Sequence, residues 1–298
     1  MTVETTPQPA DVTPPKEAIV AAVIGDISHL TTLPEVTLKI IQMVENPEAT
    51  AGELKEVIGN DPALAARILK IVNSGFYGLP ATIGSIRQAI TLLGRNALKM
   101  IAITASLAKL FRGGQMSACF SAHDLWGHCI AVACGGRMLA RACNLTLADE
   151  AFLAGLLHDV GILVEFQARR SRFIEIIERV DRDRLQTFRE VESDVLGANH
   201  EDIGAALCHQ WNFPAGLAHV AGFHHRPLYA PAESRTLVTL IHAADIIASQ
   251  LEIGYGRTVE GSLEVGLLEN LGLQAHQINH VRQELPAAAE EAAGLLRP

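Results

Sequence analysis

The sequence is poor in aromatic residues. Phe, Trp and Tyr make up only 5% of its 298 residues, whereas hydrophobic residues make up 49%. Sheets favour β-branched and aromatic side chains, and no run of alternating apolar residues is long enough here to build one. Ala, Leu and Ile dominate instead, and a chain of this length can bury a sizeable core. The sequence therefore predicts an all-α fold in two helical lobes.

Positive charge is also scarce. The formal net charge is -9, and nonspecific nucleic-acid binding needs clustered Lys and Arg. Residues 53–72 have the outline of a helix-turn-helix, but their basic residues are few, mainly Lys55, Arg67 and Lys70. Nucleic acid is therefore not an expected partner.

The five cysteines show no CxxC spacing. Such a scattered, odd set indicates reduced thiols. The first residues, Met1–Glu4, lack the basic and apolar parts of a signal peptide, and no uncharged apolar stretch reaches the length of a membrane span. We expect a cytoplasmic protein with no membrane partner.

Proline and glycine divide the chain into four parts. Four prolines within residues 1–15 predict a disordered tail. Helical spacing of apolar residues then predicts a first lobe over residues 16–115, ending at the Arg112-Gly113-Gly114 break, and a second, HD-like helical bundle over 116–285. Residues 286–298 are rich in Ala and Glu and form a tail, either helical or frayed.

An adjacent His158-Asp159 pair lies inside the apolar run 151–166. An unpaired buried carboxylate costs several kcal/mol, and a divalent metal ion would serve as its partner. Neighbouring residues on a helix point about 100° apart, so further ligands must come from other segments.

Other His and Asp residues occupy similar helical positions in the second lobe. Singly, each fits an ordinary structural role, such as a hydrogen-bonded core histidine. Together they form a candidate metal-ligand set: His128, His158, Asp159, His200, His224, His225 and Asp245. Imidazole and carboxylate without thiolate suit iron, manganese, zinc or magnesium. We expect the seven to converge in one helix-lined cavity; the alternative is a polar core cluster held by hydrogen bonds.

This order resembles the HD superfamily of metal-dependent phosphohydrolases, especially its HD-GYP phosphodiesterase branch. The chain is most similar, over about residues 17–250, to the HDOD domain, an HD-related output domain of bacterial signalling proteins. The motifs that carry this resemblance are Leu33-Pro34, Asp61-Pro62-Ala63-Leu64, Asn73-Ser74-Gly75-Phe76-Tyr77, Ile83-Gly84-Ser85-Ile86, Leu125-Trp126-Gly127-His128, Gly155-Leu156-Leu157-His158-Asp159-Val160-Gly161 and Trp211-Asn212-Phe213-Pro214.

Two departures from the phosphodiesterase pattern concern substrate handling. The resemblance implies a phosphate-binding Lys after the His-Asp-x-Gly core, and Ile162 stands there. It also implies a Gly-Tyr-Pro loop after the paired histidines, where this chain has Arg226-Pro227-Leu228-Tyr229. Of these residues, Arg226 alone could replace the missing cation.

The first-lobe motif residues have two interpretations. Asp61, Pro62, Asn73, Ser74 and Tyr77 are HDOD features by resemblance. The favoured interpretation is structural: they begin and end a helix. The other is a recognition surface beside the HD-like lobe.

Two functional hypotheses follow. The first is a noncatalytic signalling module that binds a partner protein or a small ligand; it would act in trans, because no receiver, kinase or cyclase domain accompanies it. The second is a metal-dependent phosphohydrolase acting on a nucleotide or phosphodiester, in which Asp159 bridges two metals and the metals activate water. We favour the first.

Overall fold

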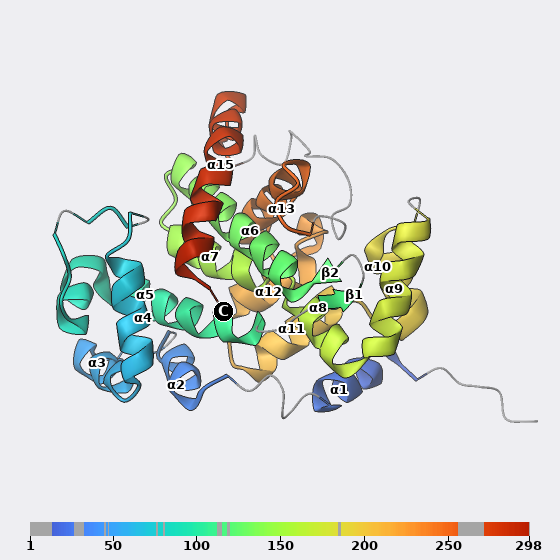
Figure 1. Cartoon of the computed structure of the whole chain (residues 1–298), viewed down its shortest axis with the longest axis horizontal. Helices are drawn as coiled ribbons and strands as arrows, with labels where there is room; N and C mark the ends of the chain where they lie inside the picture. The colour runs from blue at the N-terminus through green and yellow to red at the C-terminus, as the bar shows by residue number, and fades with distance from the viewer. Residues whose placement is uncertain are drawn as a thin grey trace, which may run out of the picture.

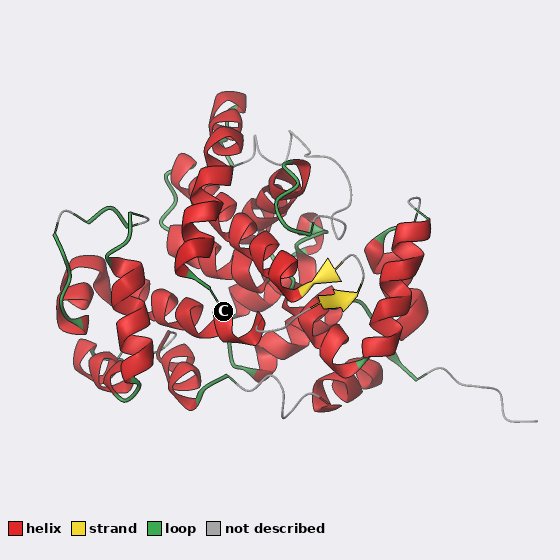
Figure 2. Cartoon of the chain, in the orientation of Figure 1, coloured by secondary structure: helices red, strands yellow, loops and turns green. Residues whose placement is uncertain are grey.

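The computed structural model describes residues 14–26, 33–44, 46, 48–75, 77–79, 81–111, 115–117, 120–183, 186–255 and 271–297. Within that part helices dominate, and the strands are the short antiparallel pair β1 (Gln115–Ser117) and β2 (Phe120–Ser121) (Figure 2). The all-α prediction is confirmed. The predicted break at 112–114 and residues 1–13 of the predicted tail lie outside the described residues.

The first lobe is built around the helix α5. Its helices are α2 (Glu35–Val44), α3 (Ala51–Gly59), α4 (Pro62–Val72) and α5 (Ile86–Leu107). Helix α5 contacts the other three, and Gly94 interrupts it with a left-handed φ of 84°. A capping box at Thr50 begins α3, and Asp61 followed by Pro62 begins α4.

The second lobe surrounds the long helix α6, which contacts α7, α13 and α15 (Figure 1). Its elements are η1 (Ala108–Phe111), α6 (Ala122–Ala142), α7 (Ala148–Leu157), α8 (Val160–Ala168), α9 (Arg170–Arg182), α10 (Phe188–Leu196), α11 (His200–Gln210), α12 (Ala215–Phe223), η2 (Pro227–Tyr229), α13 (Arg235–Gln250) and α15 (Ala275–Leu295). The segment Ala148–Ala168 is apolar and long enough to cross a membrane, but 83% of its most apolar window is buried inside the protein. Packing of α7 and α8 in the core accounts for that apolarity.

Helix α1 (Lys16–Asp26) packs on the second lobe, although the sequence predicted it as part of the first. It contacts α8 and α11, and the Lys16 ammonium lies 2.8 Å from the Asp202 carboxylate. Asp26 at its other end pairs with Arg169. The apolar face of a helix predicts that it packs, but not on which neighbour.

The first-lobe motif residues make local hydrogen bonds. The Asp61 side chain accepts from the Leu64 N–H at 2.9 Å, and Ser74 Oγ donates to the Ile71 carbonyl at 2.6 Å. The Asn73 amide bonds both backbone groups of Ile83. These contacts support the structural interpretation, whereas the recognition surface stays a prediction.

Tyr77 lies at the joint between the lobes. The guanidinium of the buried Arg137 on α6 stands 4.7 Å from the centre of the Tyr77 ring and pairs with Asp149 at 3.4 Å. The same guanidinium faces Phe152 on α7. This first-lobe motif residue therefore contacts the second lobe directly.

Residues 286–298, which the sequence set apart as a tail, continue a packed helix as far as Leu295. Helix α15 runs through Pro286, and Trp126 Nε1 donates to the Leu296 carbonyl at 2.9 Å. Ala289, Ala292 and Leu296 are buried. The predicted boundary at 286 therefore falls inside one element.

Truncating the chain after Leu285 is expected to lower the free energy of unfolding by about 3–5 kcal/mol, because three buried apolar side chains and a buried hydrogen bond are lost. Urea denaturation followed by circular dichroism measures the change. An unchanged midpoint would show that this end of α15 is not docked.

Candidate metal centre

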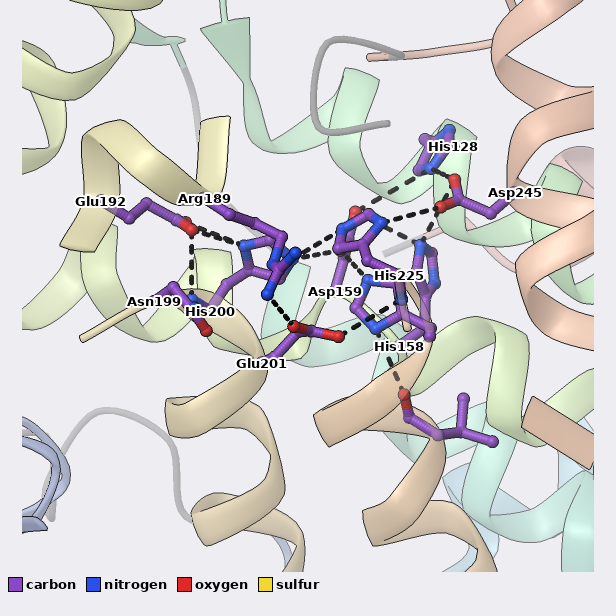
Figure 3. Close-up of polar contacts among 12 residues, drawn as sticks. His128, His158, Asp159, Arg189, Glu192, Asn199, His200, Glu201, His225 and Asp245 are labelled. Atoms are coloured by element: carbon purple, nitrogen blue, oxygen red, sulfur yellow. Dashed lines mark hydrogen bonds and ion pairs between the residues drawn. The ribbon is translucent and has the colours of Figure 1, made fainter. Parts of the chain in front are cut away.

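Five segments bring the seven predicted ligands together. His128 comes from α6, His158 and Asp159 from the junction of α7 and α8, and His200 begins α11. His224 and His225 follow α12, and Asp245 comes from α13. Figure 3 shows the labelled ligands pointing toward one another from these helices.

Asp159 is the centre of the arrangement. One carboxylate oxygen, Oδ2, lies 3.3 Å from His158 Nε2 and 3.9 Å from His128 Nε2. The other, Oδ1, lies 3.4 Å from His224 Nε2 and 3.7 Å from His200 Nε2. The two oxygens thus face two different histidine pairs.

Asp245 and His225 close the cluster. His128 Nε2 and Asp245 Oδ1 are 3.0 Å apart, and His225 Nδ1 lies 3.9 Å from Asp245 Oδ2. His225 Nε2 also lies 3.1 Å from His200 Nε2. The cluster therefore supplies three overlapping ligand groups: Asp159, His200, His224 and His225; His128, His158 and Asp159; and His158, His224 and Asp245.

These residues fit a divalent metal. Their side chains are at most 2% exposed. Buried polar atoms normally have hydrogen-bond partners. Within the described part of the chain, both oxygens of Asp159 and the Nε2 atoms of His158 and His224 have none. Ligands that each lie about 2.1 Å from one ion are roughly 3–3.5 Å from one another, close to the distances seen here.

The pKa values show how strongly the charges interact. Burial alone would lower the pKa of His158, but the Asp159 carboxylate outweighs it and raises the pKa to about 9. Burial opposes ionisation of Asp159, yet His158, His224 and His200 hold its pKa well below the usual range. Burial, with His224 and His200, lowers the pKa of His225. The site thus holds a carboxylate that needs positive charge, which a proton or a metal ion supplies.

Outer contacts fix the orientation of the imidazoles. His158 Nδ1 donates to the Gly155 carbonyl at 2.7 Å and His224 Nδ1 to the Val220 carbonyl at 3.2 Å, which leaves each Nε2 free to bind metal. His200 Nδ1 lies 2.7 Å from a carboxylate oxygen of Glu192. Burial, together with Glu192, raises the pKa of the adjacent Glu165 well above its usual range, so these two carboxyl groups retain a proton between them.

A second polar network meets His225. Its backbone N–H donates to Glu201 Oε1 at 3.2 Å, and Glu201 Oε2 lies 2.9 Å from Arg189 and 3.0 Å from Arg226. Arg226, which the sequence offered as a substitute for the missing Lys, is thus paired with Glu201. Ile162, at the position of that Lys, is fully buried in α8.

Sequence reasoning missed Glu192, Glu201, Glu165 and Arg189. Two of them could have been found from the sequence. Glu165 lies in the same apolar run as Asp159, and Glu201 directly follows the candidate ligand His200. Glu192 and Arg189 lie on α10 among other charged residues, and nothing in their spacing sets them apart.

Replacing Glu192 with Gln is expected to weaken metal binding about 10–100-fold, because the carboxylate orients His200 and raises its basicity. Titration calorimetry with Mn²⁺ or Zn²⁺ on metal-stripped protein measures the change. The control is Glu178→Gln, an exposed carboxylate on α9. Equal affinity in the two variants would show that Glu192 does not support the ligand.

Comparison with known proteins identifies the fold. Residues 30–227 match the HDOD domain. An uncharacterised protein of Treponema pallidum (strain Nichols) is 25% identical over 265 residues, which cover 87% of this chain and 49% of that protein. The chain therefore spans about half the length of this curated relative.

Solved structures agree. An HDOD domain protein of unknown function from Geobacter sulfurreducens has a TM-score of 0.77 at 23% identity, covering 94% of this chain and 98% of its own. A candidate signal transduction protein from Marinobacter aquaeolei VT8 has a TM-score of 0.76 at 22% identity, covering 95% and 66%. A candidate phosphohydrolase from Shewanella amazonensis SB2B has a TM-score of 0.71 at 23% identity, covering 93% and 98%. At these identities the likeness shows the fold alone. The match to the HDOD domain covers two thirds of the chain, and the chain therefore belongs to the HDOD family.

Proposed function

We propose that this protein is a regulatory HDOD module that acts by binding a partner protein or a small ligand, without catalysing a reaction. Its histidine cluster holds one or two divalent metal ions with a structural or signalling role. The observation that carries this proposal is the enclosure of the ligand set, whose side chains are at most 2% exposed. A phosphodiester must reach the metal and its hydroxide to be hydrolysed.

The charges around the cluster support the same proposal. Phosphoryl chemistry needs cations aimed at the phosphate oxygens. Ile162 offers neither charge nor hydrogen bond. The two arginines in the polar network, Arg189 and Arg226, both pair with the Glu201 carboxylate.

A metal-dependent phosphohydrolase is the second candidate. The observation that favours it is the position of Asp159, whose two oxygens belong to two ligand groups, as in sites where a carboxylate bridges two metals. The same family resemblance is thus compatible with two functions, which differ in whether a substrate can reach the metal ions.

Metal analysis and hydrolysis assays on one purified sample separate the two. We expect bound metal, and turnover of bis(p-nitrophenyl) phosphate and of cyclic dinucleotides no faster than in the Asp159→Ala variant. Efficient hydrolysis by the wild type that disappears in Asp159→Ala would overturn the noncatalytic proposal.

A further inference from the structure

Residues 251–255 bring the chain from the end of α13 back onto α6. Glu252 and Gly254 both adopt a positive φ, 54° and 73°, and the chain turns there. The Tyr255 N–H then donates to the Asp124 carbonyl of α6 at 3.3 Å. This turn therefore ties together two helices of the metal centre, since α13 carries a candidate aspartate ligand and α6 a candidate histidine ligand.

Gly254 packs directly against the backbone of a candidate ligand. A Cβ at this position would lie 2.4 Å from the His128 nitrogen, 2.8 Å from the His128 Cα and 2.6 Å from the Asp124 carbonyl oxygen. Asp124 and His128 stand four residues apart in α6, so this carbonyl and this N–H form a hydrogen bond of the helix. The turn thus holds the backbone of His128 from outside α6, at a contact that only glycine allows.

Tyr255 supports a second ligand through aromatic contacts. Its buried ring meets Phe120 edge-on with the ring centres 4.2 Å apart, and it lies 6.4 Å from the ring of Phe188. Phe188 begins α10, and its ring lies 6.0 Å from that of His200. Removing the Tyr255 ring would therefore leave a void beside the phenylalanine that faces His200.

His128 depends on backbone support more than three other histidines of the cluster. The Nδ1 atoms of His158, His200 and His224 are each held by a hydrogen bond to a carbonyl or a carboxylate. His128 Nδ1 is buried and has no hydrogen-bond partner within the described part of the chain. The place of its backbone and the packing around it must therefore orient the His128 ring.

We propose that the turn 251–255 positions two metal ligands. Gly254 fixes the backbone of His128, and Tyr255 holds the aromatic ring that faces His200. These two histidines face different oxygens of Asp159, at 3.9 Å and 3.7 Å, so one turn serves both sides of the ligand set. The inference rests on the metal-holding role proposed above, and it adds two residues that bind no metal themselves.

Tyr255→Ala in the full chain tests the aromatic contact. Calorimetric titration of the metal-stripped protein with Mn²⁺ should show an affinity about 10–100-fold weaker than that of the wild type, the loss typical of residues that support a ligand. Tyr255→Phe keeps the ring and should bind Mn²⁺ within about threefold of the wild type. The matched control is Ile41→Ala, which removes a buried side chain from α2 in the first lobe and should leave the affinity unchanged.

The visible spectrum of the Co²⁺-loaded protein separates positioning from a loss of stability. Its bands depend on the geometry of the ligands around the ion. They should change in Tyr255→Ala and return in Tyr255→Phe. In Ile41→Ala, which loses stability far from the cluster, they should stay as in the wild type.

Gly254→Ala tests the backbone contact, and Gly272→Ala is its control. Both glycines have a positive φ, 73° and 77°, but a Cβ at Gly272 would meet no heavy atom within 4 Å. We expect Gly254→Ala to weaken Mn²⁺ binding by at least about tenfold, because its Cβ displaces the backbone of His128. Gly272→Ala should bind Mn²⁺ like the wild type.

Wild-type affinity and spectra in folded Tyr255→Ala, or in folded Gly254→Ala, would overturn the proposal, as would an equal loss in either control. If circular dichroism shows that Gly254→Ala does not fold, the Tyr255 and Ile41 variants decide. A wild type that binds no metal would overturn this inference together with the metal-holding role. A wild type that binds metal, with unaffected variants, would overturn the positioning alone.

Discussion

Asp159→Ala is expected to lower metal affinity by more than about 100-fold. Asp159 belongs to two of the three ligand groups, and changes in residues that merely orient ligands already cost about 10–100-fold. Mass-spectrometric metal analysis after gel filtration, with calorimetric titration of the stripped protein, measures the loss.

The matched control is Asp194→Ala. Asp194 is 63% exposed and pairs with Arg179, away from the cluster, so its removal should leave the metal content unchanged. If Asp159→Ala kept its metal at the wild-type stoichiometry, the seven residues would be a polar core cluster instead of a metal centre.

Gly161→Ala is expected to destabilise the protein by about 3 kcal/mol or more and to remove the metal as well. A Cβ at Gly161 would lie 2.1 Å from the His200 carbonyl oxygen and 2.8 Å from its carbon. These are backbone atoms that no rotamer change can move, so α8 and α11 must separate. That separation would carry Asp159 and His200 apart.

The control for this prediction is Gly127→Ala, where a Cβ would meet no heavy atom within 4 Å. Because alanine is favoured over glycine inside a helix, this variant should be as stable as the wild type or about 0.5–1 kcal/mol more stable. Thermal and urea unfolding of both proteins, with metal analysis, gives the comparison. Wild-type stability in Gly161→Ala would mean that the close approach of α8 to α11 is not required.

Several helix ends have local causes that are visible in the sequence. Asp61 and Pro62 begin α4, Thr50 and Glu53 cap α3, and Gly94 interrupts α5 through a conformation that other residues adopt at a cost. The sequence set residues 286–298 apart as a tail, either helical or frayed. In the structure, packing against α6 keeps α15 continuous through Pro286 as far as Leu295.

The candidate ligands could be picked out in the sequence because His and Asp in apolar helical runs are costly unless something binds them, although each one alone also fitted a structural role. Asp159 and Asp245 are cases of this kind, and both are buried in the cluster. Their grouping was predicted from the family order of the motifs.

Only the tertiary structure decided which partners the ligands have. Glu192 and Glu201 lie among other acidic residues in the sequence, and they matter because α10 and α11 bring them to His200 and His225. Likewise, α1 has an apolar face that any neighbour could cover, and only the fold places it on α8 and α11. Local sequence determines where the helices form, because helix formation depends on near neighbours in the chain. Contacts between distant segments determine substrate access and ligand binding, because they depend on how whole helices pack.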